Sequence, residues 1–119
     1  MPIQSEIDKS QGIVFTTIYG SVTDAEAFEH EKELRDREEF RAHFNQLVDA
    51  RGVIENRLSA DGLAKLGKVT PFDLTAKRAC VVNDELAGLF AVIFGVQCGS
   101  RDNYYITKDI VYAYEWLGV

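Results

Sequence analysis

The hydrophobic and polar positions at the start of the chain repeat every two residues. Ile3, Ser5 and Ile7 alternate with charged and amide side chains, which predicts a short strand with one buried face at the edge of a sheet. After a polar turn, residues 13–19 are rich in β-branched and aromatic side chains, and Gly20 follows. We therefore expect a β-hairpin whose second strand ends at Gly20.

The repeat then changes to that of a helix. Thr23 and Glu26 have the spacing of a capping box, so a helix is expected to begin here and to continue to about Glu39. Most of its side chains are charged, as on a surface helix. Its narrow apolar stripe consists of Ala27, His30 and Leu34.

Three units of a strand followed by a helix come next. Residues 44–49 are typical of a strand that leads into a polar loop, and the following helix is expected over residues 60–66, between Ser59 as its cap and Gly67 as its end. A continuous apolar strand over residues 79–82 precedes a helix expected from Asp84 to about Phe94, and a strand over residues 103–106 precedes a helix capped by Asp109. The order ββαβαβαβα predicts one α/β domain, residues 1–119, with mostly parallel strands.

Composition narrows the possible partners. Of 119 residues, 13 are Lys or Arg and 19 are Asp or Glu, and the net charge of −6 disfavours nucleic acid and anionic lipid surfaces. The longest nearly apolar stretch, residues 86–96, is about half the length that a bilayer crossing requires. Residues 1–12 do not resemble a signal peptide, and Cys80 and Cys98 have no disulfide or CxxC pattern. We expect a cytoplasmic protein with reduced thiols and no membrane insertion.

No catalytic motif is present in the sequence. His30 and His43 are thirteen positions apart, without the spacing of a zinc site, and neither a serine-hydrolase frame nor a phosphate-binding glycine loop occurs. Glu26 lies one turn before His30, so a local ion pair is the simplest role for this histidine, and a ligand role is the alternative. We expect no enzyme activity, no metal and no cofactor.

The last two predicted helices carry more apolar side chains than a surface helix with one buried face requires. Beside the stripe of the final helix, Tyr112 and Trp116 lie one turn apart. They either cover the end of the core or form an exposed patch for a partner, a second copy or an apolar ligand. The candidate interaction surface consists of Leu89, Val92, Val96, Tyr112 and Trp116.

Several segments together resemble a known family. Residues 47–49, 59–66, 79–84 and 113–117, in this order after an opening hairpin, resemble the STAS-like proteins, the stand-alone bacterial relatives of the sporulation anti-sigma-factor antagonist. This group is often placed with lipid-binding CRAL-TRIO domains. The resemblance implies a mixed sheet of about five strands with helices mainly on one face.

The resemblance also implies a position for the phosphoacceptor serine of the antagonist branch. Matching Gly62 and Leu63 to the motif places Ala60 at the phosphoacceptor and Ser59 at the preceding aspartate. Ala60 cannot be phosphorylated, and the expected role of Ser59 is to cap the helix. The phosphorylation switch therefore does not carry over.

A binding site is predicted where strands end and helices begin. Asp49 and Arg51, at the expected end of a strand, would meet Ser59, Asp61 and Gly62 at one rim of the sheet. Alternatively, Asp49 only caps a loop and Arg51 pairs with it. The predicted function is association with another protein or with a second copy, and the alternative is a carrier or sensor of a small apolar or lipid-like ligand.

Overall fold

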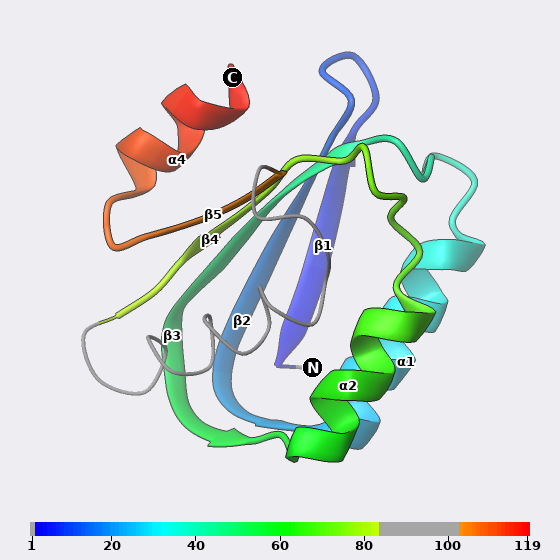
Figure 1. Ribbon diagram of the computed structural model, residues 1–119, viewed down its shortest axis with the longest axis vertical. Coiled ribbons are helices and arrows are strands. Elements are labelled where there is room, and N and C mark those ends of the chain that lie inside the picture. The colour runs from blue at the N-terminus through cyan, green and yellow to red at the C-terminus, as the bar shows by residue number, and fades with distance from the viewer. Residues whose placement is uncertain (1, 84–102) are drawn as a thin grey trace.

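The computed structural model describes residues 2–83 and 103–119, which form a five-stranded sheet covered by helices on both faces (Figure 1). The strands follow one another across the sheet in chain order, with β1 antiparallel to β2 and the other neighbours parallel. The strand bounds are β1 Ile3–Asp8, β2 Ile13–Thr23, β3 Asn45–Arg57, β4 Arg78–Val81 and β5 Tyr104–Thr107. The predicted α/β class, mixed sheet and edge position of the first strand are confirmed.

Two helices share one face of the sheet, and a third covers the other. Helices α1 (Asp24–Asp36) and α2 (Ala60–Val69) lie together on one side, whereas α4 (Ile110–Leu117) lies on the opposite side (Figure 1). Right-handed crossovers between successive parallel strands place α1 and α2 on the same face. The helix expected over residues 84–94, with Leu89, Val92 and Val96, lies outside the described residues. Within the described ranges, no helix has the length and apolar character needed to cross a membrane.

Alternation along the central strands divides the core between the two faces. The α4 side consists of Ile13, Leu47, Ala79, Val81, Ala113 and Leu117. Toward α1 and α2, the buried apolar side chains form clusters that include Val14, Val22, Ala27, Leu34, Val48, Leu66 and Cys80. The face below α1 and α2 also buries the polar residues Thr16, Gln46 and Arg78.

Two strands are longer than the sequence predicts. β2 does not end at Gly20. This glycine has the left-handed φ of +70°, but the strand continues beyond it to Thr23. β3 does not end at Asp49 either, since it remains paired with β2 as far as Arg57, with register shifts on both sides of Gly20. The extended parts of both strands curve toward the starts of α1 and α2 (Figure 1). The polar loop expected after Asp49 is therefore strand.

The starts of the helices are predicted better than their ends. The Thr23 side chain accepts from the Glu26 amide and the Glu26 side chain accepts from the Thr23 amide, so the predicted capping box is confirmed. α1 ends at Asp36 rather than at about Glu39, and α2 continues through Gly67 to Val69. At α4, the Asp109 side chain caps the first turn as predicted.

Candidate functional site

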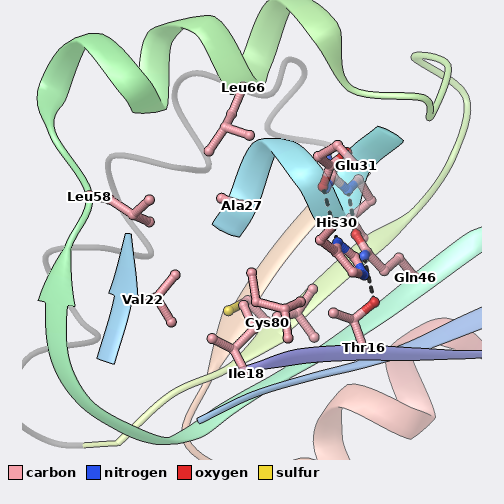
Figure 2. A pocket seen from close by; sticks show the side chains of 13 residues that line it. Thr16, Ile18, Val22, Ala27, His30, Glu31, Gln46, Leu58, Leu66 and Cys80 are labelled. Carbon is pink, nitrogen blue, oxygen red and sulfur yellow. Dashed lines mark hydrogen bonds and ion pairs between the residues drawn. The ribbon is translucent and has the colours of Figure 1, made fainter. Parts of the chain in front are cut away.

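A cavity of about 40 Å³ lies between the sheet and helices α1 and α2. This volume admits about three water molecules. Its lining combines Ile3, Thr16, Ile18, Val22, Ala27, His30, Glu31, Gln46, Val48, Leu58, Leu66, Arg78 and Cys80. Figure 2 shows that the polar side chains gather at one end, whereas Val22, Leu58 and Leu66 lie on the other side. The cavity thus has a largely apolar wall and one polar end.

The polar end is built from a continuous chain of side-chain hydrogen bonds that starts at β4. Arg78 Nε donates to Gln46 Oε1 at 2.9 Å, and Gln46 Nε2 donates to Thr16 Oγ1 at 2.9 Å. The Thr16 hydroxyl lies 2.7 Å from Ser5 Oγ, which in turn lies 2.6 Å from His30 Nε2. The chain crosses from β4 through β3, β2 and β1 to α1, so the tertiary fold brings its members together.

The arginine at the start of this chain fixes the orientation of the Gln46 amide, from which we assign the directions of the later hydrogen bonds. An arginine can only donate, so Gln46 must present its oxygen to Arg78 and its NH₂ to the next hydroxyl. In the orientation we assign, each hydroxyl then donates to the next group, and His30 Nε2 accepts from Ser5. In this orientation the other ring nitrogen, Nδ1, carries a proton and faces Glu31 Oε1 at 3.8 Å. The arrangement directs a positive dipole toward the Glu31 carboxylate.

Glu31 leaves one acceptor unused at the cavity. Its side chain is only 12% exposed, and Oε2 is buried without a hydrogen-bond partner among the described residues. A buried carboxylate oxygen without a donor is costly, so the site favours a molecule that can donate to it. The sequence pointed instead to Glu26 as the partner of His30. Glu26 is held by the Thr23 cap, and the groups that contact the imidazole are Ser5 and Glu31.

Cys80 lines the same cavity but has little nucleophilic character. Burial raises the pKa of its thiol to about 12, so the thiolate is scarce at neutral pH. Among the described residues, no group of three or more His, Cys, Asp or Glu side chains could hold a metal ion.

The first pair of predicted site residues forms a local ion pair. Arg51 donates to Asp49 through Nε at 2.9 Å and through Nη2 at 2.8 Å, and this pairing lowers the pKa of the Asp49 carboxyl despite its partial burial. Asp49 lies within β3, level with Thr17 and Val81 of the neighbouring strands, rather than at a strand end. The two side chains therefore satisfy each other, as in the alternative considered from the sequence.

The other predicted residues lie at the start of α2, beyond the end of β3. Ser59 Oγ accepts from the Gly62 amide at 2.9 Å, which confirms the predicted cap, and donates to Asp24 Oδ2 at 2.6 Å. Asp24 Oδ1 accepts from the Ser59 amide, and a Cβ at Gly62 would overlap the Asp24 carboxylate. Asp61 is exposed in the first turn. The sequence analysis missed Asp24, whose partners are 35 residues away in the chain.

The two aromatic residues of the predicted interaction surface have different environments. Tyr112 is 56% exposed, next to Val111 at 57%. Trp116 is half-buried, stacks on Tyr105 with ring centroids 5.3 Å apart, and lies 5.7 Å from Lys77 Nζ. Trp116 thus covers the core beside β5, and Tyr112 remains available for contacts.

Comparison with known proteins identifies the fold. No family model matches the chain, and no curated protein matches it. Among solved structures, it is similar to an uncharacterised protein of the DUF3478 family with a SpoIIAA-like fold from Shewanella loihica PV-4, with a TM-score of 0.63 and 17% identity over 97% of this chain and 91% of that chain. The chain has a SpoIIAA-like fold, so the predicted STAS-like resemblance is confirmed at the level of the fold.

Proposed function

We propose that the protein is a non-enzymatic binding domain that takes up a small, largely apolar molecule between its sheet and helices α1 and α2. The observation that carries this proposal is the cavity, with an apolar wall and a polar end that retains an unused acceptor on Glu31. Ligand sites in proteins commonly combine apolar walls with a few polar groups that orient the ligand. Of the two functions considered from the sequence, ligand binding has the stronger structural support.

The size of the cavity limits what can bind without rearrangement. A volume of about 40 Å³ accommodates a ligand, or the end of one, with about three or four non-hydrogen atoms. A longer aliphatic chain requires α1 and α2 to move outward from the sheet. The high pKa of Cys80 supports binding rather than chemistry at this site.

Filling the cavity tests the proposal. Native mass spectrometry of freshly purified protein should reveal a bound small molecule, and Ala27→Leu should remove it because Ala27 is buried at the cavity wall. Ala25→Leu, at an exposed position of the same helix, is the matched control and should retain the bound mass. A bound mass that survives Ala27→Leu in a folded protein would place the ligand elsewhere and contradict the proposal.

A second candidate function is protein association through the outer face of α4. The exposure of Val111 and Tyr112 on adjacent positions favours it, since aromatic side chains often anchor protein contacts. For either function we propose a cytoplasmic location, in keeping with the buried free thiol of Cys80.

A further inference from the structure

We infer that the head group recognised in the cavity is a neutral hydrogen-bond donor, a hydroxyl or a primary amide, which bonds to Glu31 Oε2. This inference rests on the proposed function and deepens it by naming the chemistry of the ligand. The two oxygens of Glu31 differ in what they contact. Oε1 faces the His30 ring, while Oε2 is buried without a partner among the described side chains. Oε2 is thus the acceptor that still lacks a donor.

A donor is favoured because the hydroxyl and amide groups at the polar end are already bonded to one another. The hydroxyls of Ser5 and Thr16 and the amide of Gln46 belong to the hydrogen-bond chain that ends at His30. A ligand that only accepts hydrogen bonds would leave the carboxylate oxygen unpaired. A ligand that donates pairs this oxygen and leaves the hydrogen-bond chain intact.

The head group should be neutral because the cavity lining already contains one charge of each sign. Arg78 and Glu31 line the same cavity, so a charged head group of either sign meets one like charge in the lining. A carboxylate or phosphate would approach the Glu31 carboxylate, and an ammonium would approach the Arg78 guanidinium. Either would bring an uncompensated charge into a space with little water. Fatty acids and phospholipid head groups are therefore disfavoured.

The orientation of the ligand follows from the lining. Glu31 and His30 lie at one end of the cavity, and the apolar side chains of Val22, Leu58 and Leu66 lie on the other side (Figure 2). The donor group should point toward α1 at Glu31, and the aliphatic part toward the apolar side. The site thereby selects short aliphatic alcohols or amides, or the corresponding end of a longer molecule.

Five small probes of equal size test separately whether the head group must donate a hydrogen bond and whether it must be neutral. 2-Propanol and acetamide carry a neutral donor, acetone lacks one, and acetate and isopropylammonium are charged, while all five have the same number of non-hydrogen atoms. Their binding can be measured by amide chemical-shift titration of the wild type, Glu31→Leu and the control Glu29→Leu, which alters an exposed glutamate of the same helix. We expect 2-propanol and acetamide to bind about five- to tenfold more tightly than acetone in the wild type and in Glu29→Leu. This preference should disappear in Glu31→Leu.

The outcomes distinguish the inference from the function on which it rests. Equal binding of acetone and 2-propanol to the wild type, tighter binding of either charged probe, or a preference that persists in Glu31→Leu would overturn the inference while cavity binding stands. If none of the five probes binds, the proposed function fails and the inference fails with it. If Glu31→Leu does not fold, Glu31→Gln serves instead. Its amide adds a donor, so acetone should gain relative to 2-propanol.

Discussion

At the scale of single residues, the Asp24 carboxylate joins the start of α2 to the start of α1. The hydrogen bond from the Ser59 side chain, and then that from the Ser59 amide, lower the pKa of Asp24 below its ordinary value of 3.8. The folded state therefore favours the ionised carboxylate. This group contributes stability above its unfolded pKa, and the contribution is lost as the pH falls through the lower folded pKa.

We predict that Asp24→Asn lowers the free energy of unfolding at pH 7 and that the difference from the wild type shrinks below about pH 4. Urea unfolding at both pH values measures the effect. Asp61→Asn, in the exposed first turn of α2, is the control and should change the stability less. A difference between wild type and Asp24→Asn that stays constant down to pH 2 would show that the charge of Asp24 is not what stabilises the helix start.

From the same contacts we predict that phosphorylation of Ser59 is unfavourable. Its oxygen both caps Gly62 and donates to Asp24, so the hydroxyl is fully engaged within the fold. A phosphate there would place about two negative charges against the Asp24 carboxylate. The role expected from the sequence, a helix cap, therefore agrees with the geometry.

At the scale of elements, sequence patterns correctly predicted the features that depend on interactions between residues close together in the chain. The capping box at Thr23 and the cap at Asp109 depend on residues within one helical turn, and both are present. The ends of β2 and β3 depend on pairing between distant segments, such as Ser21 with Glu55. Gly20 looked like a strand end because glycine commonly ends strands, but its positive φ lies inside a strand that continues.

The left-handed conformation of Gly20 leads to a prediction for the curved part of the sheet. Space around this residue is open, since a Cβ would meet no atom within 4 Å, so a substitution should act through the backbone alone. We predict that Gly20→Ala costs about 1 kcal/mol in urea unfolding. Gly20→Asn should cost less, because asparagine tolerates this conformation better. Ser21→Ala, at the next exposed position, should be nearly neutral. Equal stability of Gly20→Ala and the wild type would show that the strand does not need this conformation.

At the scale of the whole molecule, the cavity could not be located from the sequence because its polar end comes from five different elements. One sign was available: His30 occupies a position in the apolar stripe of α1, and it is indeed buried against the sheet. Gln46 and Arg78 are a weaker indication of a buried polar site, because they are polar residues next to apolar positions of strands. What they contact is decided by strand register, which aligns Gln46 with Arg78. The residues that we expected to meet at one rim of the sheet form two separate local clusters instead. The cause is that β3 continues past Asp49.

Association of whole molecules can be tested by replacing the two aromatic residues of α4 one at a time. Tyr112→Ser should leave the stability nearly unchanged because Tyr112 is exposed, and it should reduce any concentration-dependent association seen by size-exclusion chromatography with light scattering. Trp116→Ser should instead cost about 2 kcal/mol in urea unfolding, because it removes the stacking on Tyr105 and half-buried apolar area. Glu115→Ser, exposed on the same helix, is the control. A wild-type mass that stays monomeric at every concentration would exclude self-association, whereas an oligomer that Tyr112→Ser leaves intact would assign the contact to another face.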